Sequence, residues 1–124
     1  MRISIVGMFV KDLEGAKKFF MDYFGAQEHA VYEEDNGFKS YILKFDEGPK
    51  LELITKPEIV DQPKDPNRTG FVHICIKVDS REKLDEITEK FRAAGYEILY
   101  EPATVGGKET RAITFEGNIL EVSA

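Results

Sequence analysis

The strongest constraint on the fold of this chain is an internal duplication. The stretch VGMFVKD at 6–12 corresponds to ICIKVDS at 74–80, and SYILKFDEGPKLEL at 40–53 corresponds to TRAITFEGNILEV at 110–122. The offset between the copies is nearly constant, since 70 residues separate Gly25 from Gly95 and Phe45 from Phe115. A repeat about half as long as the chain indicates that one supersecondary unit is built twice.

The first copy has the residue patterns of one helix and four strands. Asp12 is a suitable helix N-cap, apolar residues then recur at helical spacing, and Gly25 stands where a helix would end. Asn36-Gly37 is a hairpin turn signal between two strand-like runs. The order predicted is β-α-β-β-β, with strands at 3–10, 27–33, 38–45 and 50–55 and the helix between Asp12 and Gly25.

The second copy repeats this order after a polar, proline-containing segment. We predict a strand at 71–78, a helix over 80–94 that ends at Gly95, and strands near 96–100, 110–115 and 119–123. Gly106-Gly107 is interpreted as an open loop. The chain is therefore predicted to be a single α+β domain over 1–124, made of repeat 1 (1–55), a linker (56–70) and repeat 2 (71–124).

Composition narrows the class of protein. The net charge is −6 over 124 residues, which argues against a nucleic-acid partner and against binding to an acidic membrane surface, because both need a basic face. No apolar run approaches the length of a membrane span. The one cysteine, Cys75, cannot form an intrachain disulfide, which fits a reducing compartment. We therefore expect a cytoplasmic protein with a small-molecule partner.

Glu52, His73 and Glu121 occupy matched positions in the two copies, and Ile5 corresponds to His73. Side chains alternate between the two faces of a strand, and both glutamates have apolar neighbours on either side. All three polar residues are thus predicted to point away from the helix-covered core. In the His73 strand, that core face is predicted to be an unbroken apolar row of Val72, Ile74, Ile76 and Val78.

Imidazole nitrogen and carboxylate oxygen together suit a divalent metal ion such as Zn²⁺, Ni²⁺, Co²⁺, Mn²⁺ or Fe²⁺. Each residue alone also has an ordinary explanation as a solvated or structural side chain. His29 lies in the weak strand, where it is expected to be exposed, and either it or water could supply a missing ligand. Cys75 shares the face of His73 and is predicted to be a buried structural cysteine.

Three segments make the chain resemble the vicinal oxygen chelate superfamily of glyoxalases, bleomycin-resistance proteins and extradiol dioxygenases. They are FVKDLEGAKKFFMDYFGA (9–26), GFVHICIKV (70–78) and GNILEV (117–122). The resemblance implies two tandem βαβββ units that form a U-shaped mixed sheet around a cleft, often completed across a homodimer. The fold hosts many chemistries, so the resemblance predicts architecture more narrowly than reaction.

The resemblance also implies roles for the matched residues. Metal ligands of glyoxalase I-type enzymes fall at four places, and Glu52, His73 and Glu121 match the second, third and fourth. Glu121 would also be the catalytic base. Ile5 stands at the first place, where a histidine is usual, and cannot coordinate a metal, so metal binding should be weakened. Phe9 stands where glutathione-dependent members have an arginine, which argues against glutathione as substrate.

The function expected is a glyoxalase-like, metal-dependent lyase or isomerase of the lactoylglutathione lyase type. It would act on a small α-oxo or α-hydroxy compound through an enediolate-type intermediate. The alternative is a non-catalytic small-molecule-binding protein that sequesters a drug, as bleomycin-resistance proteins do. No organic cofactor is expected in either case, because no phosphate-cradling or dinucleotide-binding motif is present.

Overall fold

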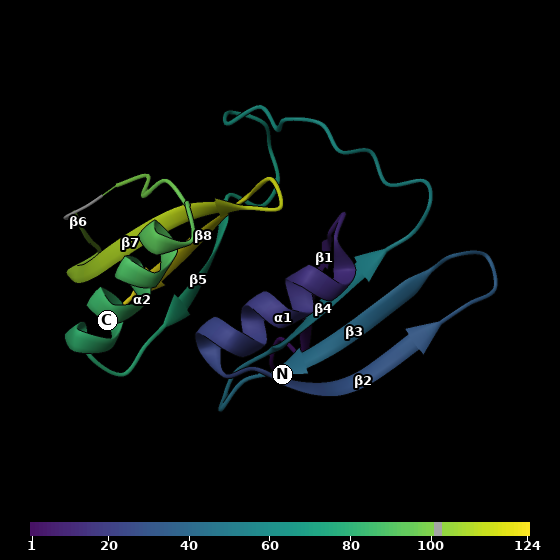
Figure 1. The fold of residues 1–124 in the computed structure, drawn as a ribbon, viewed down its shortest axis with the longest axis horizontal. Coiled ribbons are helices and arrows are strands. Elements are labelled where there is room, and N and C mark those ends of the chain that lie inside the picture. Colours follow the sequence, from purple (N-terminus) through teal and green to yellow (C-terminus); the bar gives the residue numbers. More distant parts are fainter. Residues whose placement is uncertain (101–102) are drawn as a thin grey trace. The chain divides into compact units, whose positions relative to one another are not determined.

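The computed structural model describes residues 1–100 and 103–124, which form two compact units, Met1–Asp61 and Gln62–Ala124. The boundary between the units falls inside the predicted linker, and the described residues of each unit contain one helix and four strands (Figure 1). Neither helix in the described part of the chain is long and apolar enough to span a membrane.

In the first unit the strands form one mixed sheet with the order β1-β4-β3-β2. β1 runs parallel to β4, whereas β3 runs antiparallel to both of its neighbours. The elements are β1 (Ile5–Phe9), α1 (Leu13–Phe24), β2 (Gln27–Glu33), β3 (Lys39–Lys44) and β4 (Lys50–Thr55).

The second unit repeats this topology, with the strand order β5-β8-β7-β6. β5 runs parallel to β8, and the other pairs are antiparallel. The elements are β5 (His73–Lys77), α2 (Arg81–Ala93), β6 (Ala103–Val105), β7 (Lys108–Phe115) and β8 (Asn118–Ser123). The predicted α+β class and the two βαβββ units are confirmed.

Strand register shows that the two copies are equivalent residue by residue. Gly7 is paired with Glu52 in the parallel β1/β4 ladder, and Cys75 is paired with Glu121 in the parallel β5/β8 ladder. Ile5 and His73 are each the first residue of the strand that opens their unit. The sequence alignment of Ile5 with His73 therefore corresponds to a structural equivalence.

Local side-chain chemistry explains where both helices begin and end. Asp12 accepts a hydrogen bond from the Gly15 backbone N–H at 3.0 Å, and Ser80 Oγ accepts one from Lys83 N at 3.1 Å. Such caps satisfy N–H groups that have no partner inside the helix. Gly25 ends α1 with a φ of 67°, a left-handed conformation that glycine adopts without a Cβ clash.

Each helix covers one face of its own sheet (Figure 1). α1 packs against β3 and β4, where Phe20, Leu43 and Leu53 are fully buried. α2 packs against β7, and the core there includes Leu84 and Phe91. Burial of such side chains is the main favourable term in the folding of each unit.

Two details of the second copy differ from the prediction. The strand predicted near 96–100 is wrong, because residues 96–100 contain no strand and the one that pairs with β7 is β6. The open loop predicted at Gly106-Gly107 is also wrong. Both glycines have positive φ, 58° and 79°, and they form a two-residue hairpin turn that pairs Val105 with Lys108. Because the turn consists of these two residues alone, β6 ends at Val105 and β7 begins at Lys108, which leaves no room for an open loop.

The apolar row predicted beside His73 is shorter than expected. β5 begins at His73, so Val72 lies before the strand and is exposed, as is Phe71. Ile74 and Ile76 alternate with exposed neighbours and are half-buried, as strand parity predicts. The prediction of a buried Cys75 is wrong, because its thiol lies on the exposed face of this strand.

Candidate metal and acid–base site

His73 and Glu121 lie side by side on the adjacent parallel strands β5 and β8. Nδ1 of His73 is 3.5 Å from Oε1 of Glu121. Two ligands at about 2.1 Å from one tetrahedral ion stand roughly 3.4 Å apart, so the pair has the spacing of two ligands of the same metal. The nitrogen and oxygen donors suit a borderline divalent cation. The second unit thus contains two donors of the predicted set in a suitable arrangement.

The two members of this pair differ in their exposure. The Glu121 side chain is 10% exposed, whereas that of His73 is exposed over a larger part of its surface. Leu120 and Val122, which flank Glu121, are buried in the core on the opposite face of β8. Glu121 therefore points away from the core, as strand parity predicts, but its side chain is more buried than that of a solvated surface glutamate.

Tyr100 is a site residue that sequence reasoning missed. Its hydroxyl donates a hydrogen bond to Oε1 of Glu121, the same oxygen that faces His73. Burial, followed by this hydrogen bond, raises the pKa of Tyr100 above its ordinary value, so the phenol is protonated and acts as the donor at neutral pH. No spacing pattern pointed to this residue, because it belongs to the segment before β6 that was predicted as a strand.

Cys75 occupies the register position directly opposite Glu121. Its Sγ lies 3.5 Å from the hydroxyl oxygen of Ser123, two residues beyond Glu121 on β8. The thiol is therefore on the same face of the sheet as the candidate donors.

In the first unit, Glu52 lies half-buried on β4, between the buried Leu51 and Leu53. Its partners in the ladders are Gly7 on β1 and Ile42 on β3. Strand parity therefore places the Glu52 side chain on the face of the sheet opposite the core leucines, as predicted.

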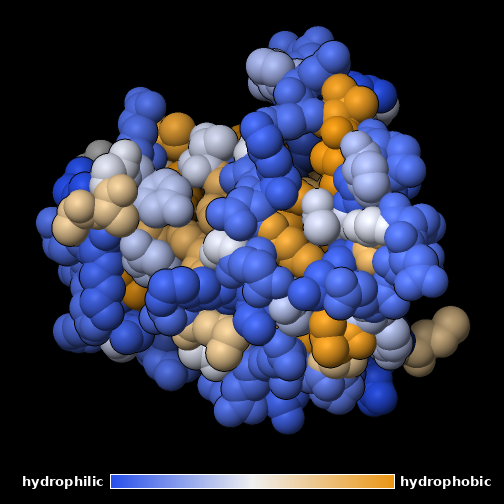
Figure 2. Space-filling model, turned by 45° about the vertical axis from the view of Figure 1, so that its right-hand side comes forward, coloured by the Kyte–Doolittle hydropathy of each residue, from blue (hydrophilic) through white to orange (hydrophobic). Residues whose placement is uncertain are grey.

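The β1 residues that share the face of Glu52 are apolar. Ile5 is 42% exposed and Phe9 is 54% exposed, and Nζ of Lys56 lies 5.1 Å from the centroid of the Phe9 ring. A Cβ added to Gly7 would have only Cδ1 of Ile54 within 4 Å, at 3.6 Å, so the surface of the sheet next to Glu52 is open at Gly7. Hydrophobic side chains also reach the surface among charged ones on the face shown in Figure 2.

His29, considered as a replacement ligand, is exposed and lies at a β-bulge in the edge strand β2. β3 separates β2 from β4 in the sheet, so the structure does not bring His29 alongside Glu52. Considering only the residues that the structure describes, neither unit by itself gathers three or more His, Cys, Asp or Glu side chains into a metal-binding group. The predicted three-residue ligand set draws on both units, with Glu52 from the first.

Comparison with known proteins identifies the family. The sequence profile of the Glyoxalase/Bleomycin resistance protein/Dioxygenase superfamily matches residues 2–121. The chain belongs to this superfamily, and the resemblance drawn from the three sequence segments is confirmed.

Among proteins similar in sequence is the uncharacterized protein YqjT of Bacillus subtilis. It is 25% identical over 103 residues, which cover 77% of this chain and 73% of YqjT.

Solved structures share the fold at lower sequence identity. A glyoxylase/bleomycin resistance protein/dioxygenase domain from Frankia sp. EAN1pec has a TM-score of 0.82 at 18% identity, covering 99% of this chain and 96% of that one. Glyoxalase I of Leishmania major, described as trypanothione-dependent, has a TM-score of 0.78 at 19% identity, covering 99% and 86%. The fosfomycin resistance protein FosX of Listeria monocytogenes, as an E126Q mutant with Mn(II) and 1S,2S-dihydroxypropylphosphonic acid, has a TM-score of 0.76 at 22% identity, covering 98% and 90%.

Proposed function

We propose that this protein is a metal-dependent lyase or isomerase that acts on a small α-oxo or α-hydroxy compound. Glu52, His73 and Glu121 would hold a divalent ion, with Zn²⁺, Ni²⁺, Co²⁺, Mn²⁺ and Fe²⁺ as candidates. The observation that carries the proposal is the His73–Glu121 pair, whose donor atoms have the spacing of two ligands on one ion. The family supports it, since FosX has been solved with Mn(II) and the Leishmania protein is a glyoxalase I.

When bound, the ion would supply Lewis-acid polarisation of a substrate oxygen. Glu121 is the residue of this chain suited to move the proton on the carbon next to that oxygen. Its side chain is largely withdrawn from solvent and held by a hydrogen bond, which keeps a general base in a defined position. Glu52, half-buried with apolar neighbours, would complete the ligand set from the first repeat.

Exchange of the α-proton tests this proposal without knowledge of the complete reaction. The chelator-treated protein is reloaded with each of the five metals and incubated in D₂O with a panel of small α-oxo and α-hydroxy compounds, and exchange is followed by proton NMR. We expect metal-dependent exchange with at least one compound, and its loss in Glu121→Gln. Glu33→Gln is the matched control, because Glu33 is an exposed glutamate on the edge strand β2. Absence of exchange with every metal would contradict the enzymatic proposal.

A second candidate function is sequestration of an apolar or aromatic molecule without catalysis. The exposed Ile5 and Phe9 on the face of Glu52 favour this function, because apolar side chains on either side of the open surface at Gly7 suit a hydrophobic ligand. In this case ligand binding would be saturable and would survive both chelation and Glu121→Gln. Binding that disappears with the metal would instead support the metal-dependent reaction.

We also propose that the protein acts as a homodimer in the cytoplasm. The family resemblance supports the dimer, and the single exposed thiol of Cys75 fits a reducing compartment, where it would not be oxidised. Sedimentation equilibrium measures the first property, and fractionation of the source cells measures the second.

A further inference from the structure

Tyr100 reaches Glu121 across an intervening strand. The backbone N–H of Leu99 donates to the carbonyl of Ala112 on β7 at 2.8 Å, which holds the chain next to β7 at this level. Ala112 is in turn the β7 residue paired with Glu121. The Tyr100 hydroxyl nevertheless contacts the Glu121 carboxylate on β8, so its side chain extends over the position of Ala112. Ala112 is almost completely buried, as expected of a small residue beneath a ring.

The first repeat has the opposite combination of residue sizes. Ile42 is paired with Glu52 as Ala112 is with Glu121, and Ala30, which is paired with Ile42, stands 70 residues before Tyr100. In repeat 1 the residue next to the glutamate is large, Ile42, and the one beyond it is small, Ala30. In repeat 2 the order is reversed, with the small Ala112 next to the glutamate and the large Tyr100 beyond it. The space for the Tyr100 ring is therefore specific to the second repeat.

The hydrogen bonding of the two glutamates differs accordingly. Within the described residues of its own unit, Glu52 receives no side-chain hydrogen bond, whereas Glu121 receives one from Tyr100. A buried carboxylate needs donors to compensate for lost hydration, and the Tyr100 hydroxyl is such a donor. The duplicated scaffold alone does not provide this contact, since the first repeat lacks it.

The two oxygens of Glu121 are also distinguished from each other. Oε1 accepts the Tyr100 hydrogen bond and faces Nδ1 of His73. Oε2 accepts no hydrogen bond from the described residues of this unit. It is also not among the buried side-chain atoms that lack a hydrogen-bond partner, so it is accessible to solvent. Since the hydroxyl of Tyr100 engages only one oxygen, it also restricts rotation of the carboxylate. Oε2 is left as the more available atom.

We propose that Tyr100 is a positioning residue that holds Oε1 of Glu121 beside Nδ1 of His73, where the two atoms can share one metal ion, and thereby leaves Oε2 for the substrate proton. This inference rests on the proposed function, because it assigns an orientation to a residue of that site. Residues that orient metal ligands by hydrogen bonds typically change metal affinity or activity by about 10- to 100-fold when they are replaced.

The test compares metal affinity in Tyr100→Phe with that in the unaltered protein. Phenylalanine keeps the ring over Ala112 and removes only the hydroxyl. We expect the dissociation constant for Mn²⁺, measured from the EPR signal of the free ion, to rise about tenfold. Tyr32→Phe is the matched control, because Tyr32 is an exposed tyrosine of the edge strand β2, and it should leave the constant unchanged.

A double-mutant cycle on metal-free protein separates the contact from its role. Urea unfolding of Tyr100→Phe, Glu121→Ala and the double variant should show that the effects of the two substitutions are not additive, because alanine removes the oxygen that accepts the Tyr100 hydrogen bond. Additive effects would overturn the contact and the inference with it. An unchanged Mn²⁺ constant in Tyr100→Phe, with normal binding by the unaltered protein, overturns the positioning role and leaves the proposed function standing. Failure of the unaltered protein to bind any divalent metal overturns both.

Discussion

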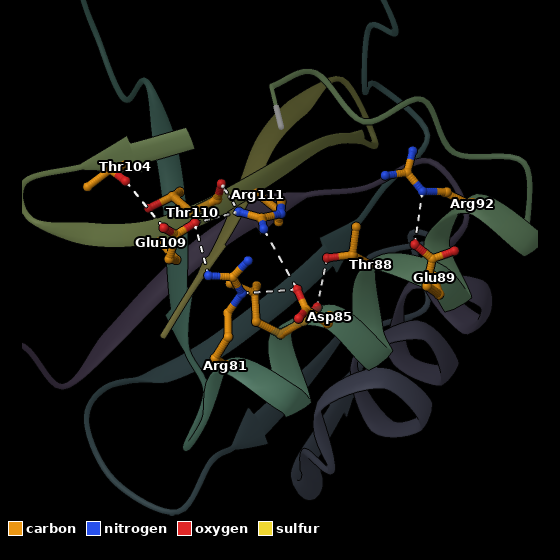
Figure 3. A network of polar contacts seen from close by, with 10 residues as sticks. Arg81, Asp85, Thr88, Glu89, Arg92, Thr104, Glu109, Thr110 and Arg111 are labelled. Atoms are coloured by element: carbon orange, nitrogen blue, oxygen red, sulfur yellow. Dashed lines mark hydrogen bonds and ion pairs between the residues drawn. The ribbon is translucent and has the colours of Figure 1, made fainter. Parts of the chain in front are cut away.

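Replacement of Arg111 offers a quantitative test of how α2 is held on the second sheet. Its side chain is only 3% exposed and lies between β7 and the helix, in the polar network of Figure 3. Its guanidinium is 3.3 Å from Glu109 and 3.7 Å from Asp85. Arg81 contacts the same two acids at 3.5 Å and 3.2 Å, but its side chain is 51% exposed. The chain thus provides two arginines that contact the same two acids and differ greatly in burial.

The expected magnitudes follow from this difference. Arg111→Ala removes two buried methylene groups beyond Cβ, worth about 1.6 kcal/mol. The ionic loss adds roughly 1 kcal/mol, below the value for a fully buried pair, because both acids are partly exposed and keep Arg81 as partner. Arg111→Ala should therefore cost about 2.5 kcal/mol. Arg111→Met, which retains the stem, should cost about 1 kcal/mol, and Arg81→Ala, at an exposed side chain, should cost less than either Arg111 variant.

Urea denaturation followed by circular dichroism measures all three free energies of unfolding. For a chain of this length, 1 kcal/mol corresponds to a shift of about 4 °C in Tm, so Arg111→Ala should lower Tm by about 10 °C. The reasoning would be refuted if Arg81→Ala were as destabilising as Arg111→Ala, because burial would then not determine the cost. Equal losses in Arg111→Met and Arg111→Ala would show that the charge, and not the packed stem, is decisive.

Two further predictions concern the first unit. Ile5→His places an imidazole at the position equivalent to His73, and because Ile5 is partly exposed, the substitution should cost little stability. We expect it to lower the dissociation constant for Mn²⁺ at least about tenfold. An unchanged dissociation constant in equilibrium dialysis would argue against a ligand position at residue 5. The hydrogen bond from the Tyr41 hydroxyl, at 2.8 Å, is the first cause that lowers the pKa of Glu14, followed among the lowering contacts by Lys39. This hydrogen bond stabilises the protein fully above pH 4.5, the ordinary pKa of a glutamate, and its contribution is lost as the pH falls through the lowered pKa of Glu14. Tyr41→Phe should therefore be less stable than the unaltered protein at pH 7, and urea denaturation should show the difference becoming smaller in acid. A difference that does not change with pH would assign the effect to packing.

Much of the fold could be predicted because local patterns repeat. The duplicated strands, Asp12 and Gly25 at the ends of α1, and the weak strand at 27–33 all occur as the spacing and turn residues indicated. The hairpin at Gly106-Gly107 was missed, although two adjacent glycines can adopt the positive φ values that a two-residue turn needs. That error placed the last edge strand too early in the sequence.

The candidate site could be predicted only in part. Strand parity placed His73 and Glu121 on one face of their sheet, and the structure brings them together. Tyr100 could not be found, because its contact with Glu121 depends on the small side chain of Ala112 on the strand between them. The participation of Glu52 stays a prediction, since it depends on the first repeat supplying a ligand to the pair in the second.

Metal stoichiometry is the most direct test of the central claim that Glu52, His73 and Glu121 bind a divalent ion. The chelator-treated protein is dialysed against each candidate metal, and protein-bound metal is measured by inductively coupled plasma mass spectrometry, beside Glu52→Ala, Glu121→Ala and the control Glu33→Ala. We expect close to one ion per chain for at least one metal, a clear loss in both site variants, and no change in the control. Metal-free protein with all five ions, or full occupancy in Glu121→Ala, would contradict the claim.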